Sequence, residues 1–276
     1  IISTYGSSTQ QAYYSMSLQF NYIIIMFFTS IMNIFWKEVA DSYSNKSVAV
    51  AAELYIKTCK YFLILVCIFS FYLIFQSRNI ILTLYLEPYV NATNTMKIIC
   101  IYPILQLFGQ LNGVVFYATE KTNILSKLHI FQGVIFIILA FSGIYILLNF
   151  TNGNIRISEM MAFVLIITSS IYVYVSSISV SKILNFNPSM PHLLIIPTFI
   201  LIISFISYQV VNLIISFLSF SNTSLISLIF NLIVNLFVML IIFVKYPRIL
   251  FIEDKDLKIF YEKLKSFNFK INTNKS

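Results

Sequence analysis

Side chains that could bind a ligand recur at helical spacing in the first apolar stretch of the chain. Alternating steps of four and three residues separate Ser15, Gln19, Tyr22, Met26, Thr29 and Asn33. This spacing places them on one face of a helix. Apart from Met26 they offer hydroxyl and amide groups without charge, which can form hydrogen bonds with an uncharged ligand.

A second stripe of this kind follows in the third apolar stretch. Its members are Pro103, Gln106, Gln110, Gly113 and Tyr117. Each stripe could line a hydrated cavity, and both together could form one cavity wall. The alternative is that the Gln and Asn side chains hold neighbouring helices together through hydrogen bonds inside a membrane. Both interpretations stay open for each of these residues.

Four residues in the apolar stretches, two of them members of the second stripe, affect the helix backbone. Gly109 and Gly113 form a GxxxG pair, which favours close packing of two helices. Pro103 and Pro197 each remove a backbone hydrogen bond, so we expect a kink at both positions.

Composition determines which elements must carry these residues. The chain has 276 residues, of which 59% are hydrophobic and 10% are charged, and its mean hydropathy is +0.86. Soluble domains carry roughly 25% charged residues, and one core cannot bury this much apolar surface. The composition predicts an all-α, polytopic membrane helix bundle.

Apolar runs of about 20 residues, the length that spans a bilayer, mark seven transmembrane helices. We predict them at 13–35, 57–76, 96–118, 126–149, 159–180, 192–217 and 223–244. They form a transmembrane bundle over residues 1–245, and residues 246–276 form a tail with a short surface helix. The polar start of the chain is expected to be a loop. Residues 33–60 are expected to form an amphipathic connector at the membrane interface.

Positive charge indicates the orientation of these helices, because cytoplasmic links retain Lys and Arg. One alternating set of links and the tail hold all but Arg78, Lys97 and Arg156 of the 18 basic residues. We therefore expect the N-terminal loop outside and the tail in the cytoplasm. The net charge of +8 is then explained by topology and by contact with anionic membrane lipids, without any nucleic-acid partner.

Motifs of enzymes and metal sites are missing from the sequence. It contains no phosphate-binding loop, nucleophile elbow, zinc motif or dinucleotide fingerprint. Cys59, Cys67 and Cys100 have no metal-ligand spacing and are expected to be buried packing residues. His129 and His192 are expected to be interfacial. These observations predict a protein that is not an enzyme and has no cofactor or metal.

Three stretches resemble a known family of membrane proteins. They are "IISTYGSSTQQAYYSMSLQF", "MNIFWKEVADSYSNKSVAVAAELYIKTCKYFLIL" and "LTLYLEPYVNATNTMKIICIYPILQLFGQLNGVVFYATEKTNILSK". They are similar to the second half of the Wzx-like O-antigen and polysaccharide flippases, which belong to the multidrug/oligosaccharidyl-lipid/polysaccharide exporter superfamily. The resemblance covers about residues 1–150, and only the hydrophobic pattern extends it further.

The resemblance implies a fold of two facing bundles with 12 to 14 helices, of which this chain would be the C-terminal part. A chain that starts at Ile1, without Met, would then lack its N-terminal bundle. The implied activity is the flipping of an undecaprenyl-pyrophosphate-linked oligosaccharide across the bacterial inner membrane by alternating access. Its repeat unit would belong to an O-antigen, a lipopolysaccharide, a capsule or an exopolysaccharide.

The implied partners are membrane lipids, the lipid-linked substrate, the N-terminal bundle of the same protein and a polysaccharide polymerase. Transport could draw on a proton or sodium gradient. The cations that hold the pyrophosphate, and any ion-coupling residue, are expected in the N-terminal bundle, because the middle of each predicted span is uncharged.

Two other functions stay open at the level of sequence. A multidrug or toxin exporter of the same superfamily would need an apolar cavity and a coupling carboxylate. A membrane scaffold for polysaccharide assembly would bury its polar stripes between helices and would have no hydrated cavity.

Overall fold

The computed structural model describes residues 2–85, 87–150, 157–187, 192–218 and 223–245, and every regular element in these ranges is a helix. Seven of the described helical segments are long and apolar enough to cross a membrane, which confirms the predicted all-α bundle. In chain order the elements are α1 (Ile2–Tyr5), α2 (Ser8–Asp41), η1 (Ser42–Lys46), α3 (Val48–Leu84), η2 (Glu87–Ala92), α4 (Thr93–Ile99), α5 (Tyr102–Ala118), α6 (Thr122–Phe150), α7 (Ile157–Ile183), α8 (His192–Leu218) and α9 (Thr223–Lys245).

The polar start of the chain is helical rather than a loop. Ser7 is the N-cap of α2, and its side chain accepts a hydrogen bond from the backbone N–H of Gln10 at 3.2 Å. The side-chain Oε1 of Gln10 in turn accepts from the Ser158 hydroxyl at 2.6 Å. These bonds begin the helix well before its apolar part and attach it to the start of α7.

The expectation of a separate connector at 33–60 is also wrong. Helix α2 continues to Asp41, one π-helical turn follows, and α3 begins at Val48 after the N-cap Ser47. The charged residues therefore extend the two long helices at their ends. A helix of 37 residues rises about 55 Å, which exceeds the hydrocarbon core of roughly 30 Å.

The predicted third span is two helices. Helix α4 ends at Ile99 and α5 begins at Tyr102, with Pro103 in its first turn. Proline has no N–H to donate and is tolerated in the first turn of a helix. The expected kink at Pro103 is thus a break between helices, whereas Pro197 lies inside the continuous helix α8.

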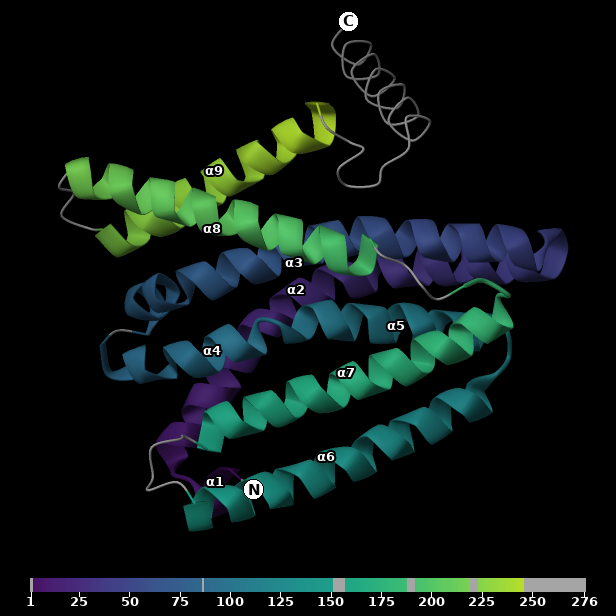
Figure 1. Ribbon diagram of the computed structural model, residues 1–276, viewed down its shortest axis with the longest axis horizontal. Coiled ribbons are helices and arrows are strands. Elements are labelled where there is room, and N and C mark those ends of the chain that lie inside the picture. The colour runs from purple at the N-terminus through teal and green to yellow at the C-terminus, as the bar shows by residue number, and fades with distance from the viewer. Residues whose placement is uncertain (1, 86, 151–156, 188–191, 219–222, 246–276) are drawn as a thin grey trace, which may run out of the picture.

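Helix α3 lies at the centre of the bundle and packs against α8 and α9 on one side and α5 on the other. Helix α7 packs against α5, α6 is the outermost helix beyond α7, and α2 crosses α5 (Figure 1). The main core lies where these helices meet and includes Phe28, Leu63, Leu111 and Phe116.

The ends of the helices alternate between the two ends of the bundle. Helices α2, α5 and α7 end where α3, α6 and α8 begin, and the N-terminus lies at the opposite end (Figure 1). This alternation agrees with the topology expected from the basic residues. Which end of the bundle faces the cytoplasm stays a prediction. The tail at 246–276 lies outside the described residues.

Candidate functional site

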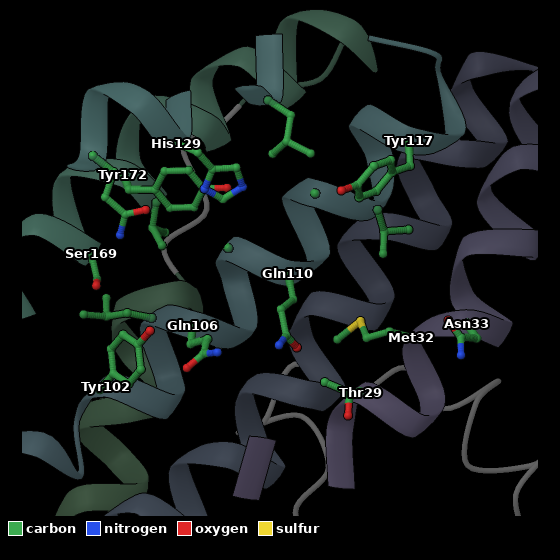
Figure 2. Close-up of a pocket in the computed structure, with 17 residues that line it drawn as sticks. Thr29, Met32, Asn33, Tyr102, Gln106, Gln110, Tyr117, His129, Ser169 and Tyr172 are labelled. Carbon is green, nitrogen blue, oxygen red and sulfur yellow. The ribbon is translucent and has the colours of Figure 1, made fainter. Parts of the chain in front are cut away.

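A cavity of about 450 Å³ lies between α2, α5, α6 and α7 (Figure 2). Helix α5 supplies the largest share of its lining, and each of the other helices contributes one face. All four helices belong to segments long and apolar enough to cross a membrane. The cavity is therefore a feature of the membrane-spanning part of the bundle.

Parts of both predicted stripes meet at this cavity. The lining includes Thr29, Asn33, Gln106, Gly109, Gln110, Gly113 and Tyr117. Met26 does not line the cavity and is 74% exposed. Helix α2 packs on α5, which brings Thr29 and Asn33 of the first stripe against the second stripe. The structure thus supports a shared wall for these residues, while ligand binding by them stays a prediction.

The N-terminal half of the first stripe does not line the cavity. Ser15, Gln19 and Tyr22 lie on the exposed side of α2. The Oε1 atom of Gln19 accepts a hydrogen bond from the Tyr85 hydroxyl at 3.1 Å, so this side chain links α2 to the end of α3. Helical spacing alone could not show where along α2 the contact with α5 begins.

The two glycines of the GxxxG pair have different surroundings. A Cβ atom at Gly109 would lie 3.0 Å from Cε1 of Tyr172, whereas a Cβ at Gly113 would meet nothing within 4 Å. Gly109 therefore allows the Tyr172 ring to approach α5, and Gly113 leaves space in the cavity. The expectation of a helix contact at both glycines holds for Gly109 alone.

Helices α6 and α7 supply lining residues that the sequence did not single out. The rings of His129 and Tyr172 are stacked, with centroids 5.1 Å apart and 19° between the ring planes, and Gln132 and Ser169 lie nearby in the lining. His129 therefore faces a cavity rather than only the membrane interface. The steps of four and three that relate Leu125, His129 and Gln132 are the signal that could have identified this face.

The cavity has a buried end and an exposed end. Ser169 and Tyr172 are 3% and 6% exposed, whereas Tyr117 is 55% exposed. In Figure 2, Ser169, Tyr102 and Gln106 lie on the opposite side of the view from Asn33 and Tyr117. The cavity thus leads from an accessible rim into the bundle.

Two polar atoms of the lining have no hydrogen-bond partner in the part of the chain that the structure describes. They are Oε1 of Gln106 and the hydroxyl of Ser169, and both atoms are buried. Buried polar atoms normally have partners. Both atoms therefore lack the partner that a buried polar atom normally has, in residues that line the cavity.

The lining is polar but almost uncharged. It contains no Asp, Glu, Lys or Arg in the part of the chain described here, and its titratable groups are His129 and tyrosines. No cluster of His, Cys, Asp or Glu suited to a metal lies within the described ranges. Hydrogen bonding and aromatic contact are therefore what this site can offer a ligand.

Another set of polar residues, away from the lining, joins helices to one another. Asn112 is fully buried, accepts from the Tyr55 hydroxyl at 2.5 Å, and donates to Ser176 at 2.7 Å and to Ser177 at 3.1 Å. These bonds connect α3, α5 and α7. Asn112 lies between the cavity-lining residues Gln110 and Gly113 in sequence. Its position on another face of α5 is what distinguishes it from them.

Fold and site together define an all-α, multi-pass membrane protein with an uncharged polar cavity among its spans. No family model, curated protein or solved structure matches the chain.

Proposed function

We propose that this chain belongs to a transporter that moves a lipid-linked oligosaccharide from one leaflet of the bacterial inner membrane to the other by alternating access. The observation that carries the proposal is the cavity between α2, α5, α6 and α7. Its lining combines amide, hydroxyl and aromatic groups and has no Asp, Glu, Lys or Arg among the described residues. Sugars present hydroxyl groups and apolar ring faces, and both kinds of surface find partners in such a lining. The proposed movement makes and breaks no covalent bond.

The sequence resemblance supports the same substrate class, namely a polyprenyl-pyrophosphate carrying an O-antigen, capsule or exopolysaccharide repeat unit. The accessible rim near Tyr117 would admit the sugar head group, while the polyprenyl chain stays in lipid. The orientation proposed from the basic residues puts the tail in the cytoplasm.

Reconstitution of the full-length protein in liposomes tests the proposal. The liposomes carry a polyprenyl-pyrophosphate oligosaccharide with a fluorescent label on the sugar, and a membrane-impermeant reductant added outside destroys the label that it reaches. With active protein we expect the signal to fall beyond the outer-leaflet share that protein-free liposomes lose. A loss equal to that of protein-free liposomes would contradict the proposal.

A matched pair of glycine variants ties this activity to the cavity. Gly113 and Gly133 both have open space where a Cβ would lie, but only Gly113 lines the cavity. We expect Gly113→Leu to block transport and Gly133→Leu, on α6, to leave it unchanged. Equal activity of both variants would show that the lipid crosses the membrane elsewhere. Transport of an apolar cationic dye that Gly113→Leu abolishes, without transport of the oligosaccharide, would favour the multidrug exporter.

A further inference from the structure

The buried end of the cavity contains groups that a membrane protein would rarely leave unpaired. Ser169 is only 3% exposed, and its hydroxyl is buried. This hydroxyl has no hydrogen-bond partner in the described ranges. Its neighbours on α7 behave differently, because Thr168 donates to the Val164 carbonyl at 2.8 Å and Ser170 to the Ile166 carbonyl at 2.8 Å. Ser169 thus does not use the helix carbonyls, which are the usual partners of helical Ser and Thr in membranes.

Gln106 presents a complementary group from the facing helix. Its Oε1 atom is buried and unpartnered within the part of the chain described, and it lines the same cavity as Ser169. An amide oxygen only accepts hydrogen bonds, whereas a hydroxyl both donates and accepts. A ligand with several hydroxyl groups can satisfy both atoms at once.

The surroundings limit the ligand further. The lining offers no Lys or Arg within the described residues to neutralise a carboxylate or phosphate, and burial of an unpaired charge is costly. The volume of about 450 Å³ falls in the range of small-molecule sites. Tyr172, whose ring lies close to Gly109 and stacks with His129, contributes an aromatic side chain to the same lining.

From this geometry we infer that Gln106 and Ser169 form a subsite for one uncharged, hydroxyl-rich sugar ring at the buried end of the cavity. The inference rests on the proposed function and adds a selection rule to it. A neutral pyranose enters this end of the cavity, and a uronic acid or another anionic sugar is rejected there.

A cysteine reporter at Gly113 tests the subsite in the full chain. The Gly113→Cys variant places a thiol where nothing lies within 4 Å of the Cβ position, and the native Cys59, Cys67 and Cys100 are buried, so the native chain gives the background. The rate of reaction with a water-soluble maleimide is measured with methyl α-D-glucopyranoside, with D-glucuronate at the same concentration, and without sugar. We expect the glucopyranoside to slow the reaction more than the glucuronate does.

Second substitutions locate the effect within the cavity. In the Gly113→Cys background we expect Ser169→Ala and Gln106→Leu each to weaken protection by the glucopyranoside roughly fivefold to tenfold, the effect of one lost hydrogen bond. Ser170→Ala is the matched control, because the Ser170 hydroxyl bonds to its own helix and is exposed, and it should leave protection unchanged.

Each result separates the subsite from the proposed transport. Equal protection in the Ser169→Ala, Gln106→Leu and Ser170→Ala variants overturns the subsite, and so does equal protection by glucose and glucuronate rings, whether or not the liposome assay shows transport. If the thiol of the Gly113→Cys variant never reacts with the maleimide, the cavity is not accessible from water. The subsite is then overturned as well.

Discussion

Two groups of uncharged polar residues in the bundle differ in whether their side chains have hydrogen-bond partners. Where α3 meets α9, Gln76 and Asn79 of α3 donate to the Ser227 hydroxyl of α9 at 3.4 and 3.1 Å. Asn79 also donates to Gln76 on its own helix at 2.7 Å. Where α2, α5, α6 and α7 meet, Gln106 and Ser169 lack partners in the described part of the chain. The same residue types therefore hold helices together on one side and line a space on the other.

The difference between the two regions teaches that polarity within a span does not by itself identify a ligand site. In lipid, a hydrogen bond between helices competes only with other protein partners, so paired Gln and Asn residues contribute to packing. An unpaired polar atom has no such structural role. Pairing together with a place in the cavity lining, which only a structure reveals, separates packing residues from site candidates.

Substitution of Asn112 should give the largest effect on stability. Asn112→Leu removes the bonds to Tyr55, Ser176 and Ser177 and leaves the buried Tyr55 hydroxyl without this partner. We expect a loss of about 2 kcal/mol in the free energy of unfolding. Titration with SDS in mixed micelles, followed by circular dichroism, measures it.

Gln110→Leu is the control for this substitution, because Gln110 lies two residues away on the same helix and lines the cavity. Its effect on the free energy of unfolding should stay within about 0.5 kcal/mol, as at positions without a structural contact. If both variants lost the same free energy of unfolding, paired amides and cavity-lining amides would not differ in their contribution to stability.

The number and type of the spans could be predicted from the sequence because a bilayer demands long apolar helices. All seven predicted spans overlap helical segments that are long and apolar enough to cross a membrane. The helix ends were harder to predict. Charged residues such as Lys37 and Glu53 lie in continuous helices, since polar residues are tolerated where a helix extends beyond the hydrocarbon region.

The cavity could be predicted only in part. Gln106 and Gln110 share a face of α5 that periodicity reveals, and both line the cavity. Ser169 lies outside both predicted stripes, and the spacing of Leu125, His129 and Gln132 marks a face of α6 without showing what that face contacts. Their place in the site depends on how α6 and α7 pack against α5, and such packing is set by side-chain fit between segments distant in sequence.

A pair of asparagines on α9 should give a smaller effect that sharpens the comparison. Asn235 donates to Ser204 on α8 at 3.3 Å, whereas Nδ2 of the equally buried Asn231, one turn earlier, has no partner within the described ranges. Asn235→Leu should lower the free energy of unfolding by about 0.6 to 1 kcal/mol. Asn231→Leu should be neutral or stabilising, because it removes a buried group without a bond.

The same SDS titration compares the two α9 variants. A clear loss of stability in Asn231→Leu, as large as in Asn235→Leu, would mean that the Asn231 amide is satisfied in the membrane. Asn231 would then belong with the paired residues of its region.

The two glycines of α5 should give the smallest effects, with a difference between them that reports on the cavity. Alanine is favoured over glycine inside a helix by roughly 0.5 to 1 kcal/mol. Gly113→Ala should gain this amount, because its Cβ meets nothing within 4 Å, while Gly109→Ala should gain less, because its Cβ would lie 3.0 Å from the Tyr172 ring. If both alanines stabilise the protein equally, Tyr172 moves freely. The buried end of the cavity would then lack the fixed aromatic wall that a sugar subsite requires.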